Sequence, residues 1–515
     1  MLLFPRLPCV AARQAAAAPA LRRVLGIPVK RSAAFRRNFH TTNLYCFAAS
    51  PTWSNMNFAT FDNIINGKPR GAAHTFSGVN PSTKEKLWDL PVATTEDVED
   101  AVRAAKKALP AWAAKSQEGR AELLEQWLQE LTKHAKELAT IVAKECGKPM
   151  SLAEFEVFTS QEYVRYHSKL RLPEDRFEDD AKVITTKYEP IGVSAAITPW
   201  NFPLILTFGK IGPALVTGNT MIVKPSPFTP YALAKAIEIA QKFLPPGVLQ
   251  VLNGDDNLGP WLTEHPEIGK ISFTGSIPTG RKIAQVCAKQ LKPCTLELGG
   301  NDAAIILPDV DVEYVARRCV EGAFFNSGQM CVATKRVFVH ESIYKPFIAA
   351  MVSAVKEHKI GPVQNEVQYK KVLGYFEDSK HSGYRFAAGT PNPSQADGYF
   401  IQPTIIDNPP DDSRIVKEEP FGPILPVQSW STEEEVIRRA NDTNTGLAGC
   451  VWGRDVAHAQ ELGAKLEVGT VFINSWEILV PQGYLGGLKE SGLGGEWGPH
   501  GLRSWVNPKV FHTYK

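Results

Sequence analysis

The sequence predicts an α/β protein with doubly wound parallel sheets in two domains, accompanied by a small β arm. Short apolar runs alternate with amphipathic helical stretches from residue 191 onward, which is typical of a parallel sheet covered by helices on both faces. The length of 515 residues is enough for about three domains. Apolar residues make up 43% and charged residues 22%, a composition that excludes a disordered or fibrous chain.

Residues 1–50 are expected to be a mitochondrial import segment that is removed before folding. No Asp or Glu occurs before Asp62, whereas residues 1–61 carry eight Lys and Arg side chains. Arg-rich, acid-free N-termini are typical of organelle import, and residues 37–42 resemble a mitochondrial processing site. A basic tail without a targeting role is the alternative. We expect the mature protein in the mitochondrial matrix.

The rest of the chain carries a net charge of −5, which gives no electrostatic case for binding nucleic acid. No stretch approaches the roughly 18 consecutive apolar residues of a membrane span. The eight cysteines show no CxxC spacing and the histidines form no HExxH motif, so we expect neither a metal site nor a disulfide framework.

Residues 94–150 are predicted to be helical. Thr95 is expected to cap the first helix, because acidic residues follow in its first turn. Apolar side chains recur at helical spacing in two sets: Val98, Ala101, Val102, Ala105 and Leu109, then Leu123, Leu124, Trp127, Leu128 and Leu131. The charged stretch 171–190 lacks this period and is expected to form an exposed hairpin or an interface arm.

Strands and helices are expected to alternate from residue 191. The predicted strands are 191–197, 220–223, 249–252, 271–274 and 294–298, and the predicted helices are 203–215, 229–243, 258–264 and 279–291. Residues 302–475 repeat the alternation, which indicates a second α/β domain. The glycine-rich stretch 492–495 follows no clear strand and is expected to be a loop.

The GxGxxG fingerprint of dinucleotide binding is missing after every predicted strand. Residues 273–280 stand between a strand and a helix instead, where the N–H groups of the helix N-terminus and the Ser276 hydroxyl favour an anion. Taken alone, this segment is more simply a strand-to-helix turn with a capping serine.

Three polar residues lie at the ends of predicted strands or in a short glycine-containing stretch. They are Asn201, Glu297 and Cys331. Active sites of open α/β sheets lie at the carboxyl ends of strands, and this combination suits acyl chemistry on a thiolate. The thiolate needs a pKa below the usual value of about 8.5, the amide can stabilise an oxyanion, and the carboxylate can activate water. Each residue also has a structural alternative: a buried small side chain, a solvated charge and a turn residue.

Six motifs in order make the chain resemble the aldehyde dehydrogenase superfamily from about residue 55 to the end. The motifs are residues 199–203 (PWNFP), 223–226 (VKPS), 273–276 (FTGS), 297–300 (ELGG), 326–331 (NSGQMC) and 419–423 (EPFGP). The resemblance implies oxidation of an aldehyde to an acid with NAD(P)+, with Cys331 as nucleophile, Asn201 in the oxyanion hole and Glu297 as the base. It also implies cofactor contacts from Trp200, Lys224, Ser226, Gly275, Ser276, Glu419 and Phe421.

The resemblance further implies a division of the chain. Residues 51–170 and 191–297 form the dinucleotide-binding domain, 298–480 the catalytic domain, and 171–190 with 498–515 an oligomerisation arm of a homodimer or homotetramer. Two other functions stay open: a non-catalytic NAD-binding protein of the same fold, and a dehydrogenase that passes the acyl group to coenzyme A. The presence of Glu297 favours water as the acyl acceptor.

The sequence favours NAD as the cofactor and an uncharged aldehyde as the substrate. Many NAD-using relatives carry Glu where this chain has Pro227, so NAD is favoured and NADP is the alternative. By the family pattern, five apolar residues line the substrate tunnel: Phe202, Leu206, Phe325, Trp476 and Leu479. Such a tunnel favours uncharged aliphatic or aromatic aldehydes, whereas Glu477 favours an amine-bearing aldehyde if it faces the substrate.

Overall fold

The computed structural model describes residues 56–392, 397–476 and 479–515. The expected import segment therefore lies outside the described residues, as does Glu477. Among the described residues, no helix combines the length and the apolar character needed to cross a membrane.

The first sheet has eight strands in the order β2-β1-β9-β8-β7-β10-β11-β22. Its strands are β1 (Asn63–Ile65), β2 (Lys68–Arg70), β7 (Val193–Ile197), β8 (Thr220–Lys224), β9 (Leu249–Val251), β10 (Lys270–Thr274), β11 (Cys294–Glu297) and β22 (Gly492–Leu493). Strands β7 to β11 are parallel neighbours. The chain leaves β7 toward β8 and β9 on one side and returns to β10 and β11 on the other, so the order reverses between β7 and β10.

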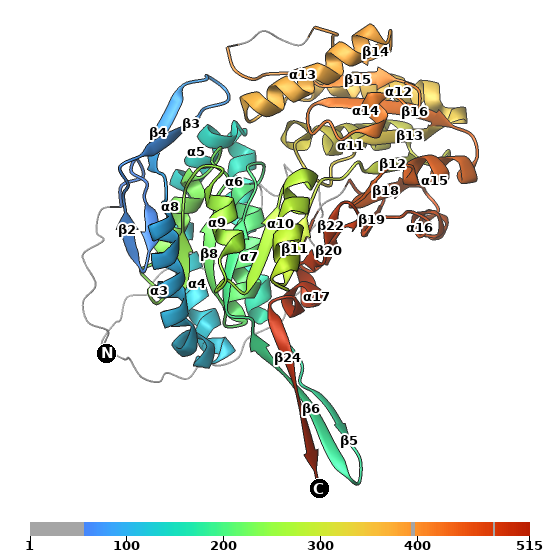
Figure 1. Cartoon of the computed structure of the whole chain (residues 1–515). Coiled ribbons are helices and arrows are strands. Elements are labelled where there is room, and N and C mark those ends of the chain that lie inside the picture. Colours follow the sequence, from blue (N-terminus) through green and yellow to red (C-terminus); the bar gives the residue numbers. More distant parts are fainter. Residues whose placement is uncertain (1–55, 393–396, 477–478) are drawn as a thin grey trace, which may run out of the picture.

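Helices cover both faces of this sheet because the strands bury alternate side chains on each face (Figure 1). Ala195 and Ile222 pack toward α3 and α9, whereas Ala196 and Val223 pack toward α7 and α8. The helices before β12 are α3 (Thr95–Ala114), α4 (Gln117–Lys133), α5 (Ala135–Cys146), α6 (Met150–Lys169), α7 (Pro203–Val216), α8 (Tyr231–Ala240), α9 (Leu258–Glu264) and α10 (Ile277–Lys289).

The predicted alternation of strands and helices from residue 191 is confirmed, with ends shifted by a few residues. The predicted cap of α3 is wrong by one position. Thr94, not Thr95, is the N-cap residue, because its hydroxyl accepts the Asp97 N–H while the Asp97 carboxylate accepts the Thr94 N–H.

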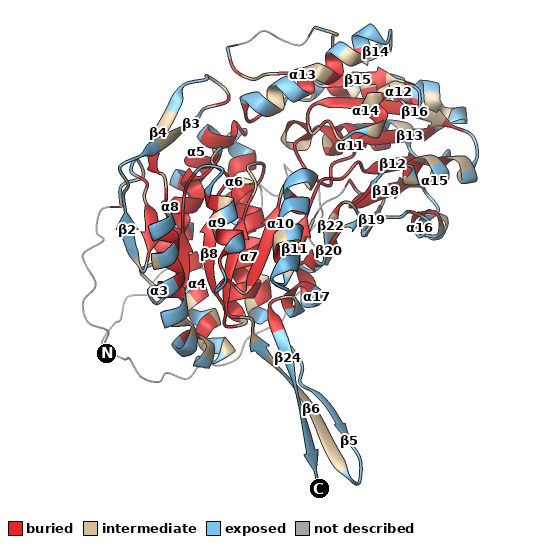
Figure 2. Cartoon of the chain, in the orientation of Figure 1, coloured by how far each residue is buried: buried red, intermediate tan, exposed pale blue. Residues whose placement is uncertain are grey.

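The second sheet has seven strands in the order β14-β15-β16-β13-β12-β18-β19, parallel except for β14. Its strands are β12 (Ala303–Ile306), β13 (Arg336–His340), β14 (Arg385–Ala388), β15 (Thr404–Asp407), β16 (Ile424–Trp430), β18 (Ala448–Trp452) and β19 (Thr470–Ile473). Its helices are α11 (Val312–Phe324), α12 (Tyr344–Glu357), α13 (Glu366–His381), α14 (Arg414–Lys417), α15 (Glu433–Asn441) and α16 (Val456–Gly463), and short 3₁₀ turns lie at η1 (Phe325–Gly328) and η2 (Glu341–Ile343). The central strands of both sheets are buried, whereas β2 at the edge of the first sheet is exposed (Figure 2).

A three-stranded arm projects from the body and is largely exposed (Figures 1 and 2). Strands β5 (Asp175–Glu178) and β6 (Lys182–Pro190) form the hairpin expected for residues 171–190. The C-terminal strand β24 (Val506–Tyr514) follows α17 (Gly498–Arg503) and pairs with the whole length of β6. The arm carries exposed apolar side chains at Phe177, Val510, Phe511 and Tyr514.

The stretch 492–495 is not simply a loop, contrary to the sequence prediction. Strand β22 pairs with the last residues of β11, and β23 (Gly495–Glu496) pairs with β20 (Leu485–Gly486). The prediction failed because the partners are distant in sequence and Gly has low strand propensity. Two further pairs are β3 (Thr75–Val79) with β4 (Lys86–Pro91), and β17 (Thr445–Gly446) with β21 (Leu488–Lys489).

Candidate active site

The residues predicted for the site gather at the carboxyl ends of β7, β8, β10 and β11. Trp200 and Asn201 follow β7, Lys224 ends β8, and Glu297 ends β11. Neighbouring strand ends are tied by hydrogen bonds from the Thr198 N–H to the Lys224 carbonyl (3.1 Å) and from the Gly275 N–H to the Glu297 carbonyl (3.0 Å). This edge lies at the reversal of strand order, where open α/β sheets bind ligands.

The loop that carries Cys331 has an unusual backbone. Asn326, Ser327 and Gly328 are three consecutive residues with positive φ angles of 49°, 61° and 73°. Residues other than glycine rarely adopt this conformation, and such conformations cluster at functional sites. Two hydrogen bonds hold the loop to the end of β7: the Asn326 amide donates to the Asn201 carbonyl, and the Asn201 amide donates to the Gln329 carbonyl, both over 3.1 Å.

Cys331 and Asn201 line the same cavity, which contains about 580 Å³ of empty space including its mouth. All five residues predicted for the tunnel also line it: Phe202, Leu206, Phe325, Trp476 and Leu479. The rings of Phe202 and Phe325 lie nearly parallel, 6.0 Å apart. The walls are therefore almost entirely apolar.

Sequence reasoning missed six residues of this wall: Phe155, Thr159, Tyr163, Ile205, Met330 and Trp497. Phe155, Thr159 and Tyr163 lie four residues apart on α6, so helical spacing places them on one face. That signal was available in the sequence. Trp497 had no such signal, since it comes from a loop near the C-terminus with a φ angle of 63°.

Trp497 occupies space that Gly209 leaves free. Its indole Nε1 lies where a side chain at Gly209 would begin, so a Cβ at position 209 would collide with the indole. The Trp497 ring also meets Tyr163 edge to face at 4.8 Å. The missing side chain on α7 thus allows a large aromatic residue from the C-terminal segment to form part of the cavity wall.

Glu297 is a buried carboxyl group, and within the described part of the chain neither of its oxygens has a hydrogen-bond partner of ordinary geometry. Burial raises its pKa to about 7, and the nearby Lys210 and Cys331 side chains only partly offset that effect. A carboxyl group with this pKa exchanges protons near neutral pH, as general-base catalysis requires.

The pKa of Cys331 was expected to be lowered, and that expectation is wrong. Burial raises the pKa of its thiol well above the usual value, and the facing Glu297 carboxyl raises it further. The thiol is therefore protonated in this state, and Glu297 is the facing group able to take its proton. Lys335 acts in the opposite direction and lowers the pKa of the thiol.

Three buried polar residues, Lys210, Ser272 and Glu496, form a cluster that influences Glu297. Lys210 forms an ion pair with Glu496, and the Ser272 hydroxyl contacts both, donating to the Glu496 carboxylate over 2.7 Å. Both charges are almost completely buried. Lys210 lowers the pKa of Glu297 and Glu496 raises it, so the two effects of the ion pair oppose each other. Sequence reasoning missed this ion pair because its members are 286 residues apart.

The residues predicted to hold the cofactor border the same edge. The Lys224 ammonium is buried, and among the described residues its one hydrogen-bond acceptor is the Pro225 carbonyl at 3.5 Å. Burial lowers the pKa of Lys224. Such a group suits hydroxyl acceptors of a ligand. Ser226 lies two residues further on, and its hydroxyl accepts the Phe228 N–H. Ser276 caps α10 by accepting the Thr279 N–H, as the simpler interpretation of this turn predicted.

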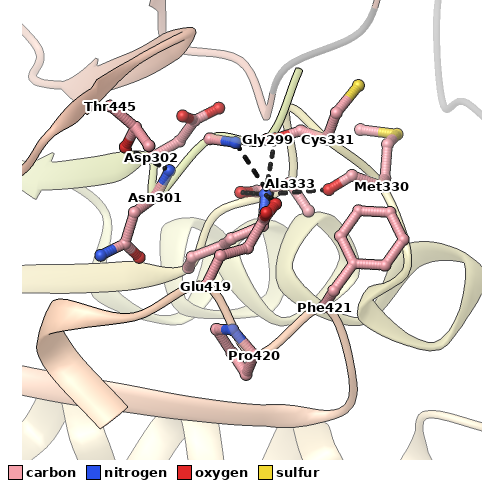
Figure 3. Close-up of polar contacts among 12 residues, drawn as sticks. Gly299, Asn301, Asp302, Met330, Cys331, Ala333, Glu419, Pro420, Phe421 and Thr445 are labelled. Atoms are coloured by element: carbon pink, nitrogen blue, oxygen red, sulfur yellow. Dashed lines mark hydrogen bonds and ion pairs between the residues drawn. The ribbon is translucent and has the colours of Figure 1, made fainter. Parts of the chain in front are cut away.

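Glu419 and Phe421 bring the second sheet to this edge (Figure 3). The Glu419 carboxylate accepts the Gly300 N–H over 3.3 Å and fits against Gly299, where any side chain would collide with it. Phe421 has a positive φ angle of 51° and meets Trp200 edge to face at 5.4 Å. These groups form a cradle of a buried cation, a carboxylate and a helix N-terminus, which fits the ribose and phosphate groups of a dinucleotide.

Comparison with known proteins gives consistent matches. The aldehyde dehydrogenase family model matches residues 69–511. The aldehyde dehydrogenase LUC3 of a Fusarium species is 44% identical over 89% of this chain and 100% of that protein. An aldehyde dehydrogenase from Bacillus cereus in complex with NAD+ has a TM-score of 0.85 at 34% identity, covering 88% of this chain and 96% of that one. An NADP-dependent enzyme from Escherichia coli has a TM-score of 0.87 at 33% identity, covering 90% and 100%.

Proposed function

The chain belongs to the aldehyde dehydrogenase family, and we propose that it oxidises an aldehyde to a carboxylic acid with NAD(P)+ through a thioester on Cys331. The observation that carries this proposal is the shared cavity of Cys331 and Asn201, with the unpaired carboxyl group of Glu297 facing the thiol. NAD(P)+ supplies a hydride acceptor when it is bound.

The protein side chains divide the reaction between them. Glu297 takes the thiol proton, the sulfur forms a bond to the aldehyde carbon, and the carbonyl oxygen becomes an oxyanion. The Asn201 amide and the Cys331 N–H donate to that oxyanion. NAD(P)+ held by Lys224, Ser226, Ser276 and Glu419 would accept a hydride from the same carbon, and Cys331 would then carry the acyl group as a thioester.

Glu297 first releases the thiol proton to solvent, and it then removes a proton from water, which attacks the thioester carbon. The carbon–sulfur bond breaks, and the leaving thiolate takes the proton from Glu297. The products are a carboxylic acid, NAD(P)H and a proton, and the thiol is regenerated.

NAD is the proposed cofactor, with NADP as the alternative. The cradle formed by Lys224, Ser226, Ser276, Glu419 and the Trp200–Phe421 pair supports a dinucleotide. Pro227 supplies no carboxylate to repel a 2′-phosphate, and the two structural relatives include one solved with NAD+ and one named as NADP-dependent. Initial rates with each cofactor over a concentration series decide between them.

Uncharged aliphatic or aromatic aldehydes are the proposed substrates. The described cavity wall offers aromatic and aliphatic side chains and no charged one. An apolar wall binds an apolar substrate favourably because both surfaces are removed from water. The same wall offers no ion-pair partner to a carboxylate or phosphate. A panel that matches benzaldehydes and alkanals against semialdehydes of equal length tests this: a higher kcat/KM for the charged members contradicts it.

The assembly and location are proposed from two separate features. The exposed apolar residues on the arm support a homodimer or homotetramer, because an isolated three-stranded sheet leaves such side chains in water. The acid-free, Arg-rich residues 1–61 support mitochondrial import. Light scattering of the purified protein tests the first, and the location of residues 1–55 fused to a fluorescent protein tests the second.

Aldehyde-dependent formation of NADH, followed by absorbance, tests the function itself. Cys331→Ala should abolish turnover while NAD binding is retained. Normal NAD binding without turnover of any aldehyde by the wild type would favour the non-catalytic alternative. Product formation that requires coenzyme A would favour the acylating alternative, which the presence of Glu297 argues against.

A further inference from the structure

Lys335 is a buried lysine between the nucleophile loop and Glu419. Its side chain is only 3% exposed. Its ammonium group donates to the carbonyl oxygens of Met330 (2.9 Å), Cys331 (2.6 Å) and Ala333 (3.3 Å), and forms an ion pair with a Glu419 oxygen at 3.3 Å. Figure 3 labels these four partner residues. A single cation is thus surrounded by four acceptors from two separate parts of the site.

The contact with the Met330 carbonyl fixes the direction of the Cys331 N–H. Both groups belong to one planar trans peptide, so the oxygen and the hydrogen point in opposite directions. Holding the oxygen toward Lys335 therefore turns the N–H away from it. The Cys331 carbonyl is held as well, so the peptides on both sides of the nucleophile are fixed.

The contact with Glu419 extends this arrangement to the cofactor side. One Glu419 oxygen forms the ion pair with Lys335 and accepts a hydrogen bond from the Gly300 N–H. The base of the loop is also anchored, since the N–H groups of Lys335 and Arg336 donate to the Asp302 carbonyl at 3.0 and 3.1 Å. The cation therefore sits on a rigid support.

We propose that Lys335 is a positioning residue that sets the oxyanion-hole peptide of Cys331 and the cofactor-binding carboxylate of Glu419 in one fixed arrangement. The proposal rests on the proposed function for the roles of Cys331 and Glu419. A lysine suits this role because three N–H bonds on one charged nitrogen reach acceptors in several directions.

Reactivity of the Cys331 thiol gives a readout that a purely structural lysine would not change. The charged groups that interact with Lys335 or Cys331 are Glu419, Asp302 and Glu297. Lys335 lowers the pKa of the thiol, so Lys335→Met should move the pH profile of Cys331 alkylation by iodoacetamide to higher pH. Peptide mass spectrometry separates Cys331 from the other cysteines.

Lys292→Met is the matched control. Lys292 is also a buried lysine, and it donates to the carbonyls of Thr263 and His265. Both variants should lose thermal stability, but only Lys335→Met should shift the alkylation profile. In turnover, we expect Lys335→Met to lower kcat by about 10²-fold through a misplaced oxyanion hole and to raise the KM for NAD. Lys335→Arg, which keeps the charge, should move the alkylation profile back toward that of the wild type.

Glu419→Gln tests the same link without removing Lys335. It leaves the cation less neutralised, so the alkylation profile should move to lower pH, opposite to the effect of Lys335→Met. An unchanged profile in folded Lys335→Met would overturn the proposal, and if that variant does not fold, an unchanged profile in Glu419→Gln would do so. Alkylation uses neither NAD nor aldehyde, so a wild type without dehydrogenase activity would refute the proposed function separately.

Discussion

Replacing Glu297 by Gln removes a buried carboxyl group that faces Cys331 and should slow release of the acyl group. The pKa of Glu297 is about 7. Roughly one tenth of the groups are then deprotonated at pH 6 and roughly nine tenths at pH 8, so hydrolysis should rise by about tenfold between these values. A carboxyl group with its ordinary pKa of 4.5 would give almost no change.

Rapid mixing of enzyme, NAD and aldehyde separates the two half-reactions. The wild type should show an NADH burst at pH 6 that fades toward pH 8 as hydrolysis quickens. In Glu297→Gln the steady rate should fall by about 10²- to 10⁴-fold, which is the usual contribution of a general base. Glu154→Gln, an exposed substitution on α6, is the control.

The same pKa predicts a stability effect that does not depend on catalysis. The folded state holds more protons than the unfolded state between pH 4.5 and about 7, so Glu297 makes folding less favourable as pH rises through that window. Above pH 7 this cost is about 3 kcal/mol. Glu297→Gln should therefore unfold at a higher temperature than the wild type at pH 8 and at a similar temperature at pH 4.5. A pH-independent difference, together with a pH-independent steady rate of the wild type, would refute the assignment of Glu297 as the base.

Three other substitutions test separate parts of the structure. Asn201→Ala should lower kcat by about 10²- to 10³-fold through loss of an oxyanion donor, while alkylation of Cys331 continues; unchanged kcat would contradict the role. Gly209→Ala should displace Trp497 and change the KM for bulky aldehydes more than the KM for acetaldehyde. Unchanged KM values for both substrates would contradict the packing of Trp497 against Gly209. Phe511→Asp, on β24, should shift the protein to smaller assemblies in light scattering, and an unaltered mass would exclude the arm from the interface.

The sequence supports prediction of the fold because its central strands are short, rich in apolar residues and separated by clear helices. The catalytic candidates were also accessible, since Asn201, Glu297 and Cys331 each lie within a recognisable motif, the first two at the ends of predicted strands. Contacts between distant segments were not accessible. The pairing of β22 with β11 and the ion pair of Lys210 with Glu496 depend on the tertiary fold, and neither leaves a local pattern.

The electrostatic state of the thiol was the main error. A sequence motif indicates which side chains lie together in the site. The effect of desolvation on their pKa values depends on how deeply the fold buries them. Burial of Cys331 outweighs the nearby cation, which is why the pKa of the thiol is raised rather than lowered.

The packing of Trp497 against Gly209 also restricts how this cavity can change during evolution or in engineering. A larger residue at 209 is blocked while the tryptophan remains. Loss of the tryptophan first would leave a void that costs about 3–5 kcal/mol. A change to a larger residue at 209 with a smaller residue at 497 therefore has to pass through an unstable intermediate or occur as a double substitution. Homologues should carry glycine with tryptophan, or a larger residue with a smaller one, far more often than any other pairing of these two positions.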